Sequence, residues 1–177
     1  MQESRNRLQT MALVHERLYQ SKDISKIELV SFARYLSSQL FSFYETDSRL
    51  IKISIETGEI MVDINTAIPF SLILMELISN ALKHAFPDGR KGEISIRIRL
   101  EANMLTLAVK DNGVGIPQAL DWRNTESLGL RLVMSLVEQL NGTIELDRVS
   151  GTAFRITIRE KADEHGRTRV TFNPVPE

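Results

Sequence analysis

The chain has 177 residues, of which 42% are hydrophobic and 25% charged, and its formal net charge is −1. This composition suits one compact domain with a substantial core, and it provides no overall basic field that would attract nucleic acid. There is no cysteine, and the histidines His15, His84 and His165 lie far apart in sequence. Disulfides, thiolate nucleophiles and sulfur-ligated metal sites are therefore excluded, and no histidine metal site is indicated.

The first part of the chain predicts two helices, over residues 2–20 and 27–44, separated by the polar residues 21–26. Residues at helical spacing form one face of the first helix: Leu8, Met11, Ala12, His15 and Tyr19. A lone histidine among apolar neighbours is more often packed in the core than used in chemistry. We therefore expect His15 to be buried.

The rest of the chain alternates between strand and helix patterns. Period-two alternation predicts strands at residues 51–55, 60–64, 94–100, 105–109, 143–148 and 152–159. Helical spacing predicts helices at 66–86, with Pro69 in the first turn, and at 128–140, ended by Asn141-Gly142. This order indicates an α+β fold. We expect a two-layer α/β sandwich, with helices on one face of a mixed, mostly antiparallel sheet.

Three segments are expected along the chain: residues 1–25, a main domain over 26–160, and a polar tail over 161–177. We expect the tail to be mobile, with part of it ordered against the sheet. The longest apolar runs fall short of the ~20 residues that a membrane helix requires. The first 20 residues are too polar for a signal peptide. The sequence therefore predicts a soluble, cytoplasmic segment.

The helix predicted at 66–86 has a polar face opposite an apolar one. Glu76, Asn80 and Lys83 fall within about 60° of one another, with His84 just beyond. An amide oxygen is a hard ligand that suits Mg²⁺, and a lysine offers positive charge to phosphate oxygens. The group therefore suits a metal–phosphate complex. A solvated face with helical ion pairs explains the same pattern, and the helix taken alone favours that explanation.

A glycine-rich segment, Asp111-Asn-Gly113-Val-Gly115, follows a predicted strand that ends by Lys110. Alternate glycines let the backbone pass close to a ligand, and a carboxylate inside a pocket can accept a hydrogen bond from an adenine amino group. The segment matches neither the dinucleotide fingerprint nor the Walker loop. Taken alone, it is also a good turn sequence.

Two later segments extend this pattern. Ser127-Leu-Gly129-Leu130 opens a predicted helix, and the free N–H groups at a helix N-terminus suit a phosphate. Gly151-Thr152 opens the last predicted strand, where an ordinary hairpin turn is the alternative explanation.

These four segments, in this order within residues 50–160, resemble the N, G1, G2 and final Gly-Thr boxes of the GHKL superfamily of ATP-binding domains. The resemblance is greatest to bacterial sensor histidine kinases of the second HisKA subtype. Residues 7–21 are similar to the second helix of that subtype's dimerisation hairpin, and residues 80–87, Asn-Ala-Leu-Lys-His-Ala-Phe-Pro, are similar to its N-box ending. The short segment between Pro117 and Leu128 resembles its ATP lid. The resemblance implies a Bergerat-type fold preceded by an N-terminal helix.

The resemblance also implies ATP and Mg²⁺ as cofactors and a role for each site residue. Asn80 would coordinate Mg²⁺, while Lys83 and His84 would contact phosphates. Asp111 would bind the adenine amino group, directly or through a water. The other residues implied to bind the nucleotide are Gly113 and Gly115, Gly129 and Leu130 at the end of the lid, and Thr152. For Glu76 the resemblance leaves two alternative roles: it would activate water, as in the superfamily's ATPases, or orient the metal site.

The implied activity is that of an ATP-dependent protein histidine kinase, which moves the γ-phosphate to a histidine on its dimerisation domain and from there to a response regulator. The family's His-Arg-x-Lys-Asn-Asn-like acceptor stretch has no counterpart in this sequence. We therefore expect residues 1–25 to be a remnant of the hairpin, with the acceptor histidine, and any membrane anchor, before Met1.

Two alternatives stay open: a degenerate kinase that serves as a phosphorelay docking scaffold, and an anti-sigma-factor type serine kinase of the same fold. The expected partners are a response regulator and the protein's own dimerisation domain. A monomer and a homodimer are both compatible with the sequence. Contact with nucleic acid or membrane is not expected for this segment.

Overall fold

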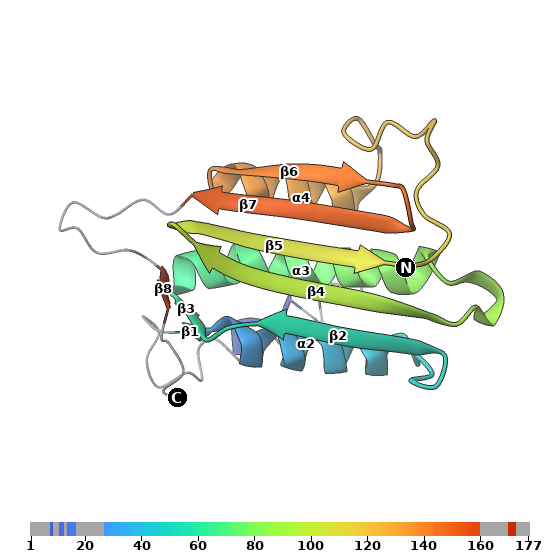
Figure 1. The fold of residues 1–177 in the computed structure, drawn as a ribbon, viewed down its shortest axis with the longest axis horizontal. Helices are drawn as coiled ribbons and strands as arrows, with labels where there is room; N and C mark the ends of the chain where they lie inside the picture. Colours follow the sequence, from blue (N-terminus) through green and yellow to red (C-terminus); the bar gives the residue numbers. More distant parts are fainter. Residues whose placement is uncertain (1–7, 9–10, 13, 17–26, 160–169, 173–177) are drawn as a thin grey trace.

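The computed structural model describes residues 8, 11–12, 14–16, 27–159 and 170–172 (Figure 1). Its helices are α2 (Leu29–Phe43), α3 (Ile64–His84) and α4 (Leu128–Gln139), with a short 3-10 helix, η1 (Pro87–Gly89). Its strands are β1 (Ile27–Glu28), β2 (Ile51–Thr57), β3 (Ile60–Val62), β4 (Gly92–Glu101), β5 (Met104–Asp111), β6 (Gly142–Asp147), β7 (Thr152–Arg159) and β8 (Val170–Phe172).

Five strands form the main sheet in the order β2-β4-β5-β7-β6, in which only the β2–β4 pair is parallel. Figure 1 shows α2, α3 and α4 together on one face of this sheet. A parallel pair needs a long crossover, and α3 lies in the connection between β2 and β4. The predicted two-layer sandwich with a mixed, mostly antiparallel sheet is therefore confirmed.

The small second sheet, β1-β3-β8, was not predicted. β3 follows β2 after two residues, yet it leaves the main sheet and pairs with β1 and β8. β8 belongs to the segment predicted as a tail partly ordered against the main sheet, but it pairs with β3 in the small sheet. The rest of that tail lies outside the described residues, so the boundaries 1–25, 26–160 and 161–177 stay predictions.

Helix α3 forms the centre of the core. It begins at Ile64, two residues earlier than predicted, because the Asp63 side chain caps it by accepting a hydrogen bond of 2.8 Å from the Thr66 N–H. Pro69 consequently lies in the second turn and not in the first. Among the described helices α3 is the one long and apolar enough to cross a membrane, but 72% of its most apolar stretch is buried in the fold. A core helix has the same composition.

The expected burial of His15 is wrong. Residues 8, 11–12 and 14–16 are helical, and the rest of the predicted helix over 2–20 lies outside the described residues. His15 is exposed and Leu8 is 68% exposed, whereas Val14 is fully buried in the core. The helix therefore packs through the face that includes Val14. Apolar spacing alone could not distinguish this face from the adjacent one, because both carry apolar residues.

Candidate functional site

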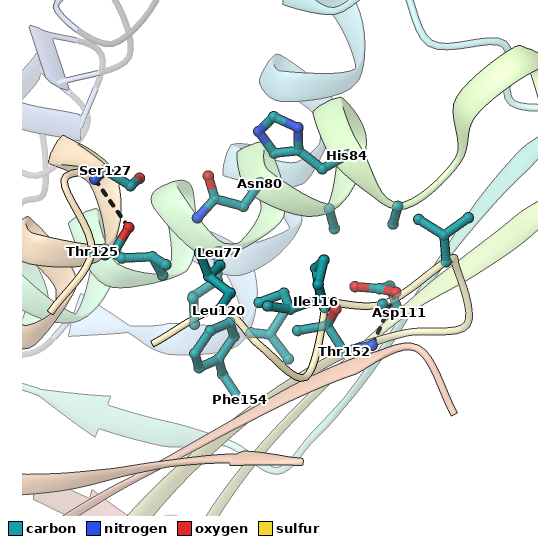
Figure 2. A pocket seen from close by; sticks show the side chains of 17 residues that line it. Leu77, Asn80, His84, Asp111, Ile116, Leu120, Thr125, Ser127, Thr152 and Phe154 are labelled. Atoms are coloured by element: carbon teal, nitrogen blue, oxygen red, sulfur yellow. Dashed lines mark hydrogen bonds between the residues drawn. The ribbon is translucent and has the colours of Figure 1, made fainter. Parts of the chain in front are cut away.

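A pocket of about 440 Å³ opens between α3, the end of β5, the start of α4 and β7 (Figure 2). The loop of residues 112–127, which we call the lid loop, forms one wall. Six of the residues predicted from the sequence line the pocket: Asn80, His84, Asp111, Gly115, Leu130 and Thr152. Four others, Glu76, Lys83, Gly113 and Gly129, are not among the lining residues.

Asp111 is the last residue of β5, and its side chain is 5% exposed. Its Oδ1 atom accepts hydrogen bonds from the backbone N–H groups of Gly113, at 2.9 Å, and Thr152, at 3.2 Å. Two fixed donors on one oxygen hold the carboxylate in a single orientation. Among the described residues, none donates a hydrogen bond to Oδ2. The Asp111 side chain therefore has one oxygen available for a donor on a ligand.

Gly151 explains how the backbone comes so close to Asp111. Its φ is +89°, and a Cβ atom added there would lie 2.1 Å from the Asp111 carbonyl oxygen and 2.9 Å from Oδ1. Only glycine fits this conformation and this contact. Asp111, Gly151 and Thr152 together form what we call the floor of the site. The sequence pointed to Gly151-Thr152 as a motif, but not to Gly151 as a residue that the position of Asp111 requires.

Gly113 has a different contact from the one expected. A Cβ atom there would lie 2.1 Å from the carbonyl oxygen of Ala85, just after α3, and the next residue, Val114, donates its N–H to the same oxygen at 2.9 Å. Gly113 therefore fits the start of the lid loop against the end of α3. Gly115, with φ +77°, is the glycine of this segment that lines the pocket.

The polar face predicted on α3 divides in the structure. Between Pro69 and Ser79 every residue except Leu72 is buried, so the helix reaches the pocket's polar end only from Asn80 onward. Asn80 is half-buried and His84 exposed, and both line the pocket (Figure 2). Glu76, one turn earlier, is 1% exposed and lies outside the lining. The periodicity of a helix gives a direction for each side chain, but not what covers it.

Lys83 turns away from the pocket lining. Its ammonium group lies 5.7 Å from the centroid of the Tyr44 ring, at the end of α2, and its side chain is half-buried. This is the geometry of a cation–π contact. The structure therefore brings Asn80 and His84 to the pocket and leaves Lys83 beside it.

The donor set fits Mg²⁺ that is held mainly by a ligand's own oxygens. No group of three or more Asp, Glu or His side chains among the described residues could hold a metal ion. The Asn80 amide is an oxygen donor at the pocket wall. Mg²⁺ commonly binds through one or two protein oxygens together with phosphates and waters.

The apolar wall was not predicted from the sequence. Val109 and Phe154 come from β5 and β7, where they are register partners, and both line the pocket. The other apolar or small lining residues are Leu77, Ala81, Ala85, Val114, Ile116, Pro117 and Leu120. Thr125 and Ser127 complete the lining, and the Thr125 hydroxyl accepts the Ser127 N–H at 3.1 Å. Alternation along β5 and β7 predicted which residues face inward, but no local pattern showed which of them line the pocket and which lie in the core.

A pocket over one face of a mixed sheet, with a buried carboxylate, a glycine-built floor and a loop wall, agrees with the arrangement expected from the resemblance to ATP-binding domains. The family described as histidine kinase-, DNA gyrase B-, and HSP90-like ATPase matches residues 65–162. A second family, described as histidine kinase and called HisKA_2, matches residues 1–44. The chain belongs to the histidine kinase-, DNA gyrase B- and HSP90-like ATPase family.

Relatives from two bacteria support this assignment. The chain is 32% identical over 149 residues to blue-light-activated histidine kinase 2 of Erythrobacter litoralis, with 80% of the chain and 43% of the relative covered. It is 30% identical over 170 residues to the sensor histidine kinase PdtaS of Mycobacterium tuberculosis, with 93% and 33% covered. The chain thus spans less than half the length of either relative.

A solved structure shows the same fold. The histidine kinase domain of the Erythrobacter litoralis EL346 blue-light activated histidine kinase superposes with a TM-score of 0.73 at 28% identity, covering 86% of this chain and 74% of that one. The predicted kinship with sensor histidine kinases of the second HisKA subtype is therefore confirmed.

Proposed function

We propose that the pocket binds Mg-ATP, with the adenine at the floor and the phosphates toward Asn80. The buried carboxylate of Asp111 carries this proposal. Oδ1 is held by two backbone N–H groups, which leaves Oδ2 as an acceptor on a residue that lines the pocket. The adenine 6-amino group is a donor, whereas guanine has an acceptor oxygen at the same position. A fixed acceptor in an apolar pocket therefore favours adenine, because an unpaired buried acceptor is costly.

The phosphates would lie along the polar edge of the pocket. Asn80 would supply an amide oxygen to Mg²⁺, whose chemistry is to neutralise phosphate charge and orient the phosphoryl group. His84 lines the same edge. Lys83 would reach a phosphate by leaving the Tyr44 ring. Ser127 and Leu130 line the pocket at the start of α4, where backbone N–H groups face outward from the helix.

Glu76 fits the positioning role better than the role of a base. It lies one turn before Asn80, is buried and does not line the pocket. A general base must come within hydrogen-bond reach of the water it activates. We therefore assign to Glu76 the orientation of the Asn80 end of α3.

In this account the chain is the ATP-binding catalytic part of a cytoplasmic sensor histidine kinase. It would transfer the γ-phosphate to a histidine on the dimerisation domain and from there to a response regulator. Its family and its sensor-kinase relatives support this assignment. Incubating the chain and a histidine-bearing dimerisation hairpin with γ-labelled ATP should give acid-labile label. Acid-stable label would instead indicate a serine acceptor.

Nucleotide selectivity tests the pocket itself. A fluorescent ATP analogue is bound to the full chain with Mg²⁺ and then displaced by ATP or GTP. We expect ATP to compete in the micromolar-to-millimolar range usual for enzymes, and GTP to be at least about tenfold weaker. Chelation of Mg²⁺ should weaken the binding of ATP more than the binding of adenosine. Equal displacement by ATP and GTP would contradict an adenine site at Asp111.

A further inference from the structure

The lid loop forms no helix or strand between β5 and α4, yet three of its residues, Ile116, Pro117 and Leu120, line the pocket. Neither the family boxes nor the pocket lining explains what holds this loop in place. A loop without regular structure needs other partners for its backbone carbonyl groups. Figure 1 shows this loop at the same end of the main sheet as the turn between β6 and β7.

That turn provides the partners through one side chain, Arg148. Its Nη1 atom donates to the carbonyl oxygens of Pro117, at 2.8 Å, and Gln118, at 2.9 Å, and its Nη2 atom donates to that of Leu120, at 2.9 Å. The loop closes its own turn there through the Leu120 N–H, which donates to Pro117 O at 3.0 Å. A planar guanidinium can meet several acceptors at once, which an ammonium does less well.

The charge of Arg148 is used on backbone atoms alone. Among the described residues it forms no ion pair with a carboxylate, and it is not part of the pocket lining. Its side chain is half-buried. The contact therefore does not depend on which side chains the loop carries, and it does not require a bound nucleotide.

The β6–β7 turn also holds the floor. Gly151 passes close to Asp111, and the Thr152 N–H donates to Asp111 Oδ1. One short turn thus contacts the floor with its last residues and the lid loop with its first. Arg148 links this turn to residues 117–120 of the lid loop, whereas the bond from Gly113 to Asp111 joins only the start of that loop to the floor.

A second anchor follows in the loop. Trp122 is 8% exposed, and its ring meets that of Phe154 edge-on at 5.7 Å, with Phe154 in turn lining the pocket. Arg123 stacks on Trp122 at 4.6 Å and donates to the Ile144 carbonyl at 3.3 Å. Trp122 and Arg123 therefore anchor the later part of the lid loop, whereas Arg148 holds the earlier part at Pro117 and Leu120.

We infer that Arg148 is a positioning residue for the nucleotide pocket: it holds residues 117–120 as the wall against which the adenosine half of the nucleotide packs, without touching the nucleotide. This inference rests on the proposed nucleotide site. If the wall is in place only a tenth of the time without Arg148, the dissociation constant rises about tenfold. Because the wall contacts adenosine, the loss is the same for ATP, ADP and adenosine.

The test uses the full chain and the variants R148A, R148K and R155A. Arg155 is the matched control, because it is an exposed arginine on β7 with no contact to the lid loop among the described residues. Thermal melting checks that each variant folds. Amide hydrogen exchange of Leu120, measured without nucleotide, reports on the loop. Displacement titrations with ATP, ADP and adenosine report on the pocket.

We expect faster exchange at Leu120 and about tenfold weaker binding of all three ligands in R148A. In R148K the exchange rate and the affinities should lie between those of R148A and the wild type, and in R155A both should equal those of the wild type. If R148A does not fold, the same two measurements on R148K decide the question. Unchanged exchange at Leu120 in R148A would overturn the role of Arg148. So would a loss of affinity that is largest for ATP, smaller for ADP and smallest for adenosine, and that R148K restores, because it would mean that the charge acts on the phosphates. A wild type that binds no nucleotide would overturn the proposed function, while the exchange data would still decide whether Arg148 holds the loop.

Discussion

The floor and the lid loop both line the pocket and touch each other at Gly113 and Asp111, but they are built in different ways. The floor is buried: Asp111 is 5% and Thr152 9% exposed, and their contacts are between β5 and β7 in the main sheet. The lid loop is mostly exposed, and beyond its first residues it is held by hydrogen bonds from arginine side chains to backbone carbonyls and by the ring of Trp122. Both walls are ordered by hydrogen bonds, but only those of the floor are shielded from water.

This difference fits the tasks of the two walls. A buried hydrogen bond in a sheet resists opening, so the acceptor on Asp111 is in place before a ligand arrives. A loop whose own residues are mostly exposed can yield and close again at little cost, as nucleotide entry and release require. We therefore expect substitutions in the floor to affect folding and binding together, and substitutions in the lid loop to affect mainly binding.

The largest effect is expected for Gly151→Ala in the floor. The added methyl group would meet Asp111 O at 2.1 Å, in a residue with φ +89°. A left-handed conformation costs about 1–2 kcal/mol and overpacking about 1–3 kcal/mol. We expect urea denaturation to show a loss of roughly 2–5 kcal/mol, and nucleotide binding to fall with it.

Gly89→Ala is the matched control for that prediction. Gly89 also has a positive φ, of +70°, but nothing lies within 4 Å of an added Cβ atom. It should lose only the conformational part, about 1–2 kcal/mol, and keep nucleotide binding. Equal losses in the two variants would show that the close approach at the floor does not matter.

The smallest effect is expected at Asp121 in the lid loop. Hydrogen bonds from the Asn124 side chain, and then from its backbone, lower the pKa of Asp121 below its usual value. A folded pKa below the unfolded one stabilises the loop above the unfolded pKa of about 3.9, and that stabilisation is lost as the pH falls through the folded pKa. Since Asp121 is exposed, the loss should be confined to its own turn.

Amide chemical shifts of Arg123 and Asn124, whose N–H groups donate to Asp121, measure this effect. They should stay constant from pH 8 to 5 and move only below about pH 4. In Asp121→Asn the pH-dependent movement should disappear. A midpoint near neutral pH would contradict the assignment to Asp121 and would show that the lid loop responds to another group.

The comparison also explains what the sequence could predict. Each part of the floor carries a local signal, because Asp111 ends a strand and Gly151 precedes the strand that Thr152 begins, so both were found although the bond between Thr152 and Asp111 spans 41 positions. In the lid loop, the residues that meet carry no such signal: Arg148 lies in an ordinary turn, and the carbonyl group of Pro117 that it binds is 31 positions away. No periodicity links two such residues, so Arg148 and Trp122 were missed.

Helix faces show the same limit. The helix and strand patterns predicted the sandwich and placed Asn80 on a polar face, which the structure brings to the pocket. They could not show that Glu76 is covered by the fold, that Lys83 lies against Tyr44, or that Val14 and not His15 packs into the core. Each of these depends on which neighbouring element covers a residue, and that is decided by tertiary packing.

The most direct measurement of the central claim is the affinity of Mg-ATP for the wild type and for Asp111→Asn. An asparagine oxygen can keep both bonds from Gly113 and Thr152, while its NH₂ group replaces Oδ2 as a donor facing the adenine amino group. We expect the fold to be kept and the affinity to fall by about a hundredfold, because a donor then meets a donor in a buried site. Equal affinities of the two proteins would contradict an adenine site at Asp111.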